Sequence, residues 1–216
     1  MDSSLSAKVA LVNHPVFLHK LSLIRKAETD TAQFRQLIHE AGLLLAMQAT
    51  SDLDLIRTTQ QRSPIDYYQG VEIKDNVGLF PILRAGLGLV DAFRVMVPEA
   101  RVHHLGLYRE KSTLLPVEYY NKLPSKCTTQ IGIVLDPIIA TAGTAIAAIN
   151  ILKDWGLTKI KFVAVLGSRP GISALQQAHP DIQIIVGEID DGLSEDGYII
   201  PGLGDAGDRL FGTVHE

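Results

Sequence analysis

Residues 131–152 pass from an apolar run to a run of small residues and then to a helical pattern. This stretch constrains the fold more than any other part of the sequence. Residues 131–135 are apolar and mostly β-branched, as in a strand buried on both faces, and Asp136 with the proline after it ends that run. Residues 140–144 are all small, so backbone N–H groups there can surround a phosphate, and two threonine hydroxyls can add donors. Residues 145–152 continue as a helix whose positive end faces the loop. The stretch predicts a buried strand, an anion-binding loop and a helix.

A second unit of the same kind lies earlier in the chain. Residues 77–83 form an apolar run, and Arg84 and a glycine turn follow it before a helical pattern begins. Arg109 follows a third predicted strand, 102–108, in the same way. In open α/β folds ligands bind outside the carboxyl ends of the strands, so both arginines are candidate anion ligands. Arg84 could instead pair with a nearby carboxylate such as Asp91.

Strands and helices alternate along the rest of the chain. This alternation predicts an α/β fold with a doubly wound, mostly parallel sheet, and one domain over residues 1–216 is the simplest organisation. Residues 51–70 are polar without a clear period, which suits a connecting region or irregular strands. The further strands are expected at 9–12, 160–166 and 182–186, and the further helices at 16–25, 30–50 and 170–178.

Residues 110–124 are expected to leave the body of the protein as a projecting β-arm. Two prolines bracket an aromatic run with high strand propensity, which favours a hairpin. Tyr119 and Tyr120 could equally pack within a strand, because aromatic side chains serve cores more often than sites.

Charge and composition exclude several classes of protein. A formal net charge of -4 and a pI near 6.0 give no general basic field, so nucleic acid is not an expected partner. No stretch approaches the roughly 18 apolar residues of a membrane span, and the first residues lack the apolar core of a signal peptide. The single cysteine, Cys127, rules out an internal disulfide and suits a reducing compartment. We expect a cytoplasmic protein without a membrane partner.

The glycine-rich segment 197–213 is the second informative stretch, and we expect neither helix nor regular strand in it. Gly202, Gly204 and Gly207 have the spacing of a dinucleotide fingerprint. Only residues 208–216 follow, however, which is too little chain for the helix and strand that the fingerprint requires. Glycines in such a loop instead let main-chain groups approach a flat ligand closely.

Together these motifs resemble the uracil branch of the type I phosphoribosyltransferases. Residues 136–145 look like the ribose-phosphate loop of that branch, with an acidic residue, a proline and a turn of small residues. Residues 81–88 are similar to its arginine-containing turn, and 197–213 is nearly identical to the signature that ends those enzymes. The resemblance also includes the N-terminal segment 14–25 and spans essentially the whole chain.

The resemblance implies an activity, partners and a set of site residues. The reaction would convert uracil and 5-phosphoribosyl 1-diphosphate (PRPP) to UMP and diphosphate in pyrimidine salvage, with Mg²⁺ carried by PRPP near Asp205. It further implies a homodimer or larger homo-oligomer, an arm over the active site, and GTP as a candidate effector. The implied catalytic residues are Asp136, Arg109 and Asp205; those for PRPP are Arg84, Arg109, Asp136, Pro137, Ile138, Ile139, Ala140, Thr141, Ala142, Gly143, Thr144 and Asp205; those for uracil are Tyr198, Ile199, Gly204, Asp205 and Ala206.

One departure from the family pattern keeps a second interpretation open. Ala142 replaces the first glycine of the phosphate turn, and an alanine fits there if its φ is below zero, which we expect. Ala142 also favours a non-catalytic, nucleotide-sensing regulator of the same fold, against which the intact tail argues. A Rossmann oxidoreductase using Gly86 and Gly88 is a third hypothesis, but Asp91 occupies its third glycine position.

Overall fold

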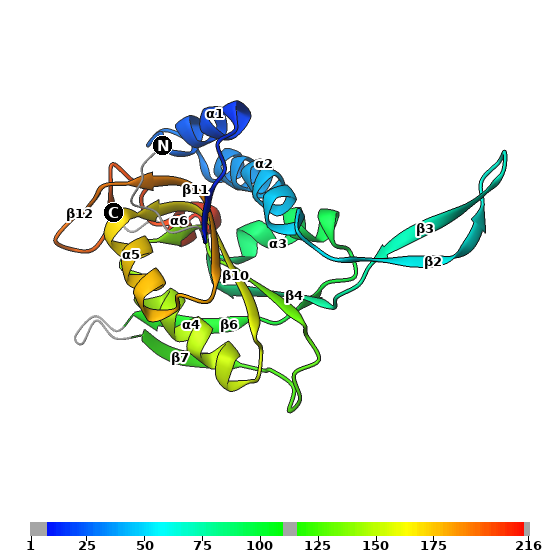
Figure 1. The fold of residues 1–216 in the computed structure, drawn as a ribbon. Coiled ribbons are helices and arrows are strands. Elements are labelled where there is room, and N and C mark those ends of the chain that lie inside the picture. Colours follow the sequence, from blue (N-terminus) through cyan, green and yellow to red (C-terminus); the bar gives the residue numbers. More distant parts are fainter. Residues whose placement is uncertain (1–7, 110–115, 214–216) are drawn as a thin grey trace.

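The computed structural model describes residues 8–109 and 116–213. A mostly parallel sheet lies between two layers of helices, as predicted (Figure 1). Its strands are β1 (Val9–Leu11), β4 (Val77–Leu83), β5 (Arg101–Val102), β6 (Leu105–Arg109), β7 (Pro116–Asn121), β8 (Ile131–Leu135), β9 (Ile138–Ile139), β10 (Lys159–Ser168) and β11 (Gln183–Asp190). Their order is β1-β11-β10-β8-β4-β6-β7, with β5 beside β4 and β9 beside β10. Only the pairing of β6 with β7 is antiparallel among these described strands.

The helices divide between the two faces of the sheet. On one face lie α1 (Pro15–Ile24), α2 (Thr31–Thr50) and α3 (Leu87–Met96), and on the other α4 (Gly143–Asp154) and α5 (Arg169–Ala178) (Figure 1). Side chains alternate between the faces, so in β8 Ile133 joins the core beneath α2 and Val134 the core beneath α4. Every residue of β8 is buried, which explains why its sequence is continuously apolar.

The longest helix, α2, follows the pattern predicted for it. The Asp30 side chain accepts a hydrogen bond from the Gln33 N–H at 2.8 Å and so caps the first turn. Its buried side chains recur at helical spacing and face the sheet, and they include Phe34, Leu37, Ile38, Ala41 and Leu45.

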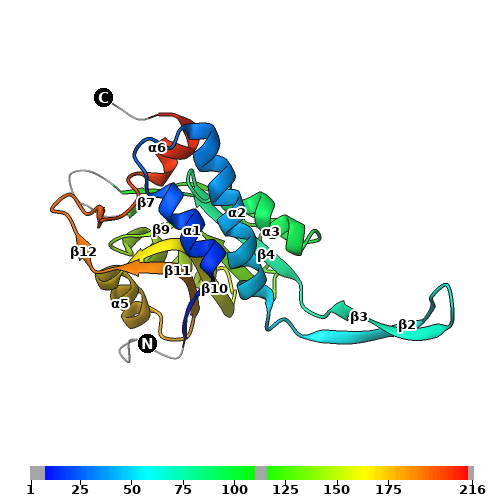
Figure 2. The same ribbon diagram turned by 90° about the horizontal axis from the view of Figure 1, so that it is seen from above.

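The projecting arm is a different hairpin from the predicted one. It consists of β2 (Leu55–Arg62) and β3 (Tyr67–Ile73), which extend away from the body in both views (Figures 1 and 2). The predicted arm, 110–124, instead supplies β7 at the edge of the main sheet, and 110–115 lie outside the described residues. Residues 55–73 face solvent on both sides, so neither face carries the apolar alternation by which strands are recognised.

The glycine-rich tail is more regular than expected. It contains β13 (Ile199–Ile200), paired with β12 (Gly192–Leu193), and the short helix α6 (Ala206–Phe211). The Asp205 carboxylate accepts a hydrogen bond from the Asp208 N–H at 2.9 Å, and Gly212 ends the helix with φ 67°. No helix in the described part of the chain combines the length and apolar character that a membrane crossing requires.

Candidate active site

A cavity of about 460 Å³ opens at the carboxyl ends of the central strands. Open α/β sheets bind ligands at this edge. Three segments line the cavity: the turn after β4, the loop after β8 and the tail around β13 and α6. The lining residues are Ala85, Asp136, Ile138, Ala140, Asp196, Gly197, Tyr198, Ile199, Gly204, Asp205, Ala206 and Gly207.

The predicted anion loop and the predicted base-binding tail therefore meet in one cavity. All five of the uracil-binding candidates line it, together with three members of the loop, Asp136, Ile138 and Ala140. The remaining members, Pro137, Ile139, Thr141, Ala142, Gly143 and Thr144, lie behind this lining or at the start of α4. The N-terminus of α4, a helix of 12 residues, follows the loop directly as expected.

The predicted anion loop is held in place by contacts with β10 and with the start of α5. Ile138 and Ile139 pair with β10, opposite Leu166 and Gly167. The fully buried Ser168 hydroxyl donates to the Ala140 carbonyl at 2.5 Å and accepts from the Gly171 N–H at 2.9 Å. The loop backbone is therefore fixed before any ligand binds.

Asp136 lines the cavity and is half-buried. Burial raises the pKa of its carboxyl group to about 7, and the charge of Asp205 acts in the same direction. The Ile138 N–H, which donates to Asp136 Oδ1 at 3.3 Å, opposes this shift only in part. Two carboxyl groups therefore share one cavity, and that of Asp136 becomes charged only as pH rises through about 7.

Arg84 directly follows β4 and precedes the lining residue Ala85, so it lies at the rim of the same cavity. Its guanidinium pairs with Asp208 at 3.0 Å and donates to the Thr213 hydroxyl at 3.2 Å, so Asp91 is not its partner. An ideal Cβ built on Gly207, a lining residue, would lie 3.7 Å from Arg84 Nη2. Arg109 is the last residue of β6, and its side chain lies outside what the structure describes.

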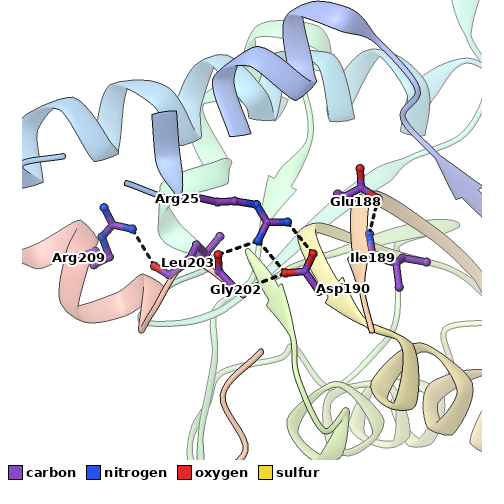
Figure 3. Close-up of polar contacts among 7 residues, drawn as sticks. All are labelled: Arg25, Glu188, Ile189, Asp190, Gly202, Leu203 and Arg209. Atoms are coloured by element: carbon purple, nitrogen blue, oxygen red, sulfur yellow. Dashed lines mark hydrogen bonds and ion pairs between the residues drawn. The ribbon is translucent and has the colours of Figure 1, made fainter. Parts of the chain in front are cut away.

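The predicted base-binding tail is anchored by residues far away in the sequence (Figure 3). Both terminal nitrogens of Arg25 donate to the Asp190 carboxylate at 2.7 Å, and Nη1 also donates to the Gly202 carbonyl at 2.7 Å. The Gly202 N–H donates to Asp190 at 2.9 Å. Although burial acts to raise the pKa of Asp190, these donors outweigh it and hold the pKa below its usual range.

Arg209 anchors the tail a second time. Its guanidinium donates to the Leu203 carbonyl at 2.8 Å, to Ile24 at 2.6 Å and to Lys26 at 2.6 Å, and it stacks 4.3 Å from the Phe34 ring centre. Two arginines thus tie the loop 199–205 to the end of α1 and the start of α2.

Comparison with known proteins identifies the family. The sequence model described as "Uracil phosphoribosyltransferase" matches residues 11–213. The chain belongs to the uracil phosphoribosyltransferase family. A relative of that name from Roseiflexus sp. (strain RS-1) is 50% identical over 210 residues, which cover 96% of this chain and 99% of the relative. Another, from Macrococcus caseolyticus, is 47% identical over 208 residues, 96% of this chain and 99% of the relative.

Solved structures agree with this assignment. A protein from Aquifex aeolicus is 32% identical and superposes with a TM-score of 0.90, over 96% of this chain and all of that one. A hypoxanthine phosphoribosyltransferase from Staphylococcus aureus, 11% identical, matches 74% of this chain and 76% of its own with a TM-score of 0.50, which supports the fold alone. The Rossmann oxidoreductase hypothesis is wrong, and the family match favours an enzyme over a non-catalytic regulator.

The expectation of a negative φ at Ala142 is wrong. Ala142 has φ 66° and ψ -2°, the left-handed conformation, and no other described non-glycine residue has a positive φ. The turn into α4 therefore keeps the backbone shape that the usual family glycine would provide. An L-residue there costs about 1–2 kcal/mol, and the packing of the loop against Ser168 offsets this cost.

Proposed function

We propose that this uracil phosphoribosyltransferase family member converts uracil and PRPP to UMP and diphosphate. The observation that carries the proposal is the single cavity in which the anion loop after β8 meets the glycine-rich tail. The reaction needs a phosphate, a ribose and a flat base to be held in contact. The two segments would supply a phosphate loop and a base loop, and Asp136 lines the same cavity.

The proposed roles follow from how charge develops in the reaction. Breaking the bond between C1′ and diphosphate leaves positive charge on the ribose ring and negative charge on the leaving group. The backbone of residues 140–144 would hold the 5′-phosphate at the start of α4. Asp136 would accept hydrogen bonds from the ribose hydroxyls and favour the positive ring, while Arg84 and Arg109 would stabilise the diphosphate. The protein's contribution is positioning and electrostatics.

Base selection is proposed to depend on main-chain groups of the tail. Uracil presents an acceptor, a donor and an acceptor in sequence, at O2, N3–H and O4. The cavity is lined there by Tyr198, Ile199, Gly204, Asp205 and Ala206, and Gly204 adopts φ 79°, which favours glycine. Because Gly202 and Leu203 are tied to Arg25 and Arg209, the main chain here is held in a fixed shape.

Mg²⁺ is proposed to enter with the donor. Among the described residues, no group of three or more His, Cys, Asp and Glu side chains could hold a metal ion. Mg²⁺ commonly binds through one or two carboxylates together with substrate phosphates, and Asp136 and Asp205 line the same cavity. These residues fit an ion carried by PRPP, and such an ion would neutralise charge on the leaving diphosphate.

The base proposal predicts strong rejection of cytosine. Cytosine presents a donor at C4 and an acceptor at N3, so two buried main-chain partners would lose their hydrogen bonds. At about 1–3 kcal/mol for each, kcat/KM for uracil should exceed that for cytosine by roughly 10²- to 10⁴-fold. Radiolabelled uracil and cytosine, each supplied with PRPP and Mg²⁺, give the two values. Comparable use of both bases would place the base elsewhere, and PRPP binding without turnover of any base would favour the regulator.

We further propose that the protein is a homodimer that uses the β2–β3 arm. Several large apolar side chains on this arm are exposed, including Ile65 at 94% and Val71 at 60%. An isolated two-stranded hairpin is marginally stable in water, and exposed apolar patches of this kind mark interaction surfaces. A second copy of the chain would cover both arms through one two-fold interface. The other exposed apolar residues of the arm are Leu55, Ile56, Tyr67, Tyr68 and Ile73.

Placing negative charges on the arm's apolar surface should separate the subunits. We expect the unchanged protein to sediment as a dimer and the double variant Ile65→Asp, Val71→Asp to sediment as a monomer at the same concentration, because both charges would be buried without a partner. Val95→Asp is the matched control, since Val95 is 65% exposed on α3 and lies outside the arm. A double variant that stays dimeric would remove the arm from the interface.

Three further expectations stay predictions. A single phosphoribosyltransferase domain over 1–216 is supported by the family match to 11–213. GTP as an effector follows from the resemblance alone and is tested by adding GTP to the uracil assay. Cytoplasmic localisation likewise follows from the sequence composition.

A further inference from the structure

We propose that Asp208 is a positioning residue of the donor site, because it holds the Arg84 guanidinium in a fixed place at the rim of the cavity. This inference rests on the proposed function of Arg84 as a ligand of diphosphate. Arg84 reaches the rim from β4, whereas Asp208 belongs to α6, more than a hundred residues later in the chain. The contact therefore links the donor side of the cavity to the base side.

The contact is a closed ring of three side chains. Arg84 Nη2 donates to Asp208 Oδ1 at 3.0 Å, and Arg84 Nη1 donates to Thr213 Oγ1 at 3.2 Å. The Thr213 hydroxyl donates in turn to the same Asp208 oxygen at 2.7 Å, and the Thr213 N–H donates to the Asp208 carbonyl at 3.1 Å. Each member of the ring is thus fixed by the other two.

The ring leaves part of the guanidinium available to a ligand. An arginine carries five N–H donors in a planar fork, and the ring uses one from each terminal nitrogen. Within the described part of the chain, no hydrogen bond is formed by the others. The Arg84 side chain keeps 52% of its surface exposed, and the Asp208 side chain keeps 25%. A diphosphate at the rim would therefore meet an arginine that is already oriented and that still has N–H groups available to donate to it.

Among the described residues, no carboxylate other than that of Asp208 forms an ion pair with Arg84. The Phe211 ring centre lies 5.8 Å from its guanidinium carbon, and this contact does not fix the direction of the N–H groups. A half-exposed arginine freed from Asp208 would sample many rotamers, and binding the diphosphate would have to restrict them again. Partners that orient metal-ligating side chains are typically worth about 10- to 100-fold in affinity, and by analogy we expect an effect of roughly 10-fold here.

Asp205 caps the N-terminus of the same helix, and Arg209 anchors the helix to the end of α1. Asp208 is therefore placed by a segment that the base loop already holds rigid. A change of the Asp208 side chain should leave the anchors of the base loop in place, because Arg25 with Asp190 and Arg209 with Leu203 do not involve it.

The test is Asp208→Asn, which keeps the size of the side chain and removes its charge. PRPP affinity is measured by titration calorimetry with Mg²⁺ and without uracil, so the result does not depend on turnover. We expect the Kd for PRPP to rise roughly 10-fold, the KM for uracil to stay within about twofold, and the melting temperature to change little. Asp181→Asn is the matched control, because it breaks a comparable ion pair, to Lys153 at 2.7 Å, outside the cavity.

A double-variant cycle separates positioning from a general structural effect. In an Arg84→Ala background, Asp208→Asn should cause no further loss of PRPP affinity, because the residue that it positions is gone. An unchanged Kd in the single variant, or an equal rise in both backgrounds, would overturn the proposal. If Asp208→Asn does not fold, Thr213→Val opens the ring at another point and should raise the Kd by a smaller factor. A protein that binds PRPP as expected but never uses uracil would contradict the proposed function and leave this inference standing.

Discussion

Replacing Asp136 by asparagine is expected to remove most of the turnover and, at pH 8, to stabilise the fold. The carboxyl group has a pKa of about 7 in the folded protein and an ordinary value of 3.8. Between these values the folded state binds a proton that the unfolded state has lost, so the contribution of Asp136 to the free energy of unfolding falls as pH rises from about 4 to 7. Asparagine carries no charge at any of these pH values, so its contribution to the free energy of unfolding does not fall.

The stability difference should therefore depend on pH in a defined direction. Melting temperatures of Asp136→Asn and of the unchanged protein should nearly coincide at pH 4, with the variant increasingly the more stable as pH approaches 8. Asp91→Asn is the control, since Asp91 is exposed on α3 and its replacement should give no such trend. A pH-independent difference for Asp136 would mean that its charge is not penalised by burial.

Turnover should move in the opposite direction. If the Asp136 carboxylate faces the ribose ring, the neutral variant loses the electrostatic stabilisation of the positive ring, and kcat should fall by about 10²-fold or more. Steady-state rates with saturating uracil, PRPP and Mg²⁺ measure this. A variant that is more stable yet turns over normally would make Asp136 a structural residue alone.

The second large effect is expected from Gly171→Ala on α5. A Cβ at this position would lie 2.1 Å from the Ala140 carbonyl oxygen, a backbone atom of the anion loop that Ser168 also holds. The loop cannot keep its position beside this Cβ atom. The backbone N–H groups of residues 140–144, which we propose bind the phosphate, must therefore shift. A displacement of about 1 Å in a positioning element can cost roughly 10²-fold in rate, so kcat/KM for PRPP should fall by about that factor.

Gly192→Ala is the matched control for this variant. A Cβ at Gly192 would meet nothing within 4 Å, and no positive φ restricts that residue. Its kinetics should equal those of the unchanged protein, while Gly171→Ala should also lose about 1–3 kcal/mol of stability from overpacking. Normal PRPP kinetics in Gly171→Ala would show that the loop position behind Ala140 is not what orders the phosphate site.

Sequence patterns predicted those parts of the molecule whose signals are local. The strand, small-residue loop and helix around Asp136 were recognised because each has its own period and composition. That the tail joins them in one site was implied by the family resemblance and not by any pattern in the tail itself. The conformation of Ala142 was predicted wrongly because its φ is set by how the loop closes between β9 and α4, a constraint that no single residue reveals.

Long-range anchors could not be predicted at all. Arg25 and Asp190 are separated by 165 positions, and their pairing depends on β11 ending beside α1. The helix α6 was missed because its 6 residues are too few to display a period and lie among glycines. The arm was missed because a hairpin exposed on both faces looks like a polar connection until its partner is considered.

The exposed arm also has a consequence for the lifetime of the protein in a cell. A newly made subunit would expose Ile65 and its neighbours on a two-stranded hairpin, which is only marginally stable by itself. Proteases cleave such exposed segments of low local stability first. Association with a second subunit would hide that segment. We therefore expect degradation to remove unassembled chains selectively, so that the cellular amount of the enzyme is set by how quickly its subunits find one another as well as by how quickly they are made.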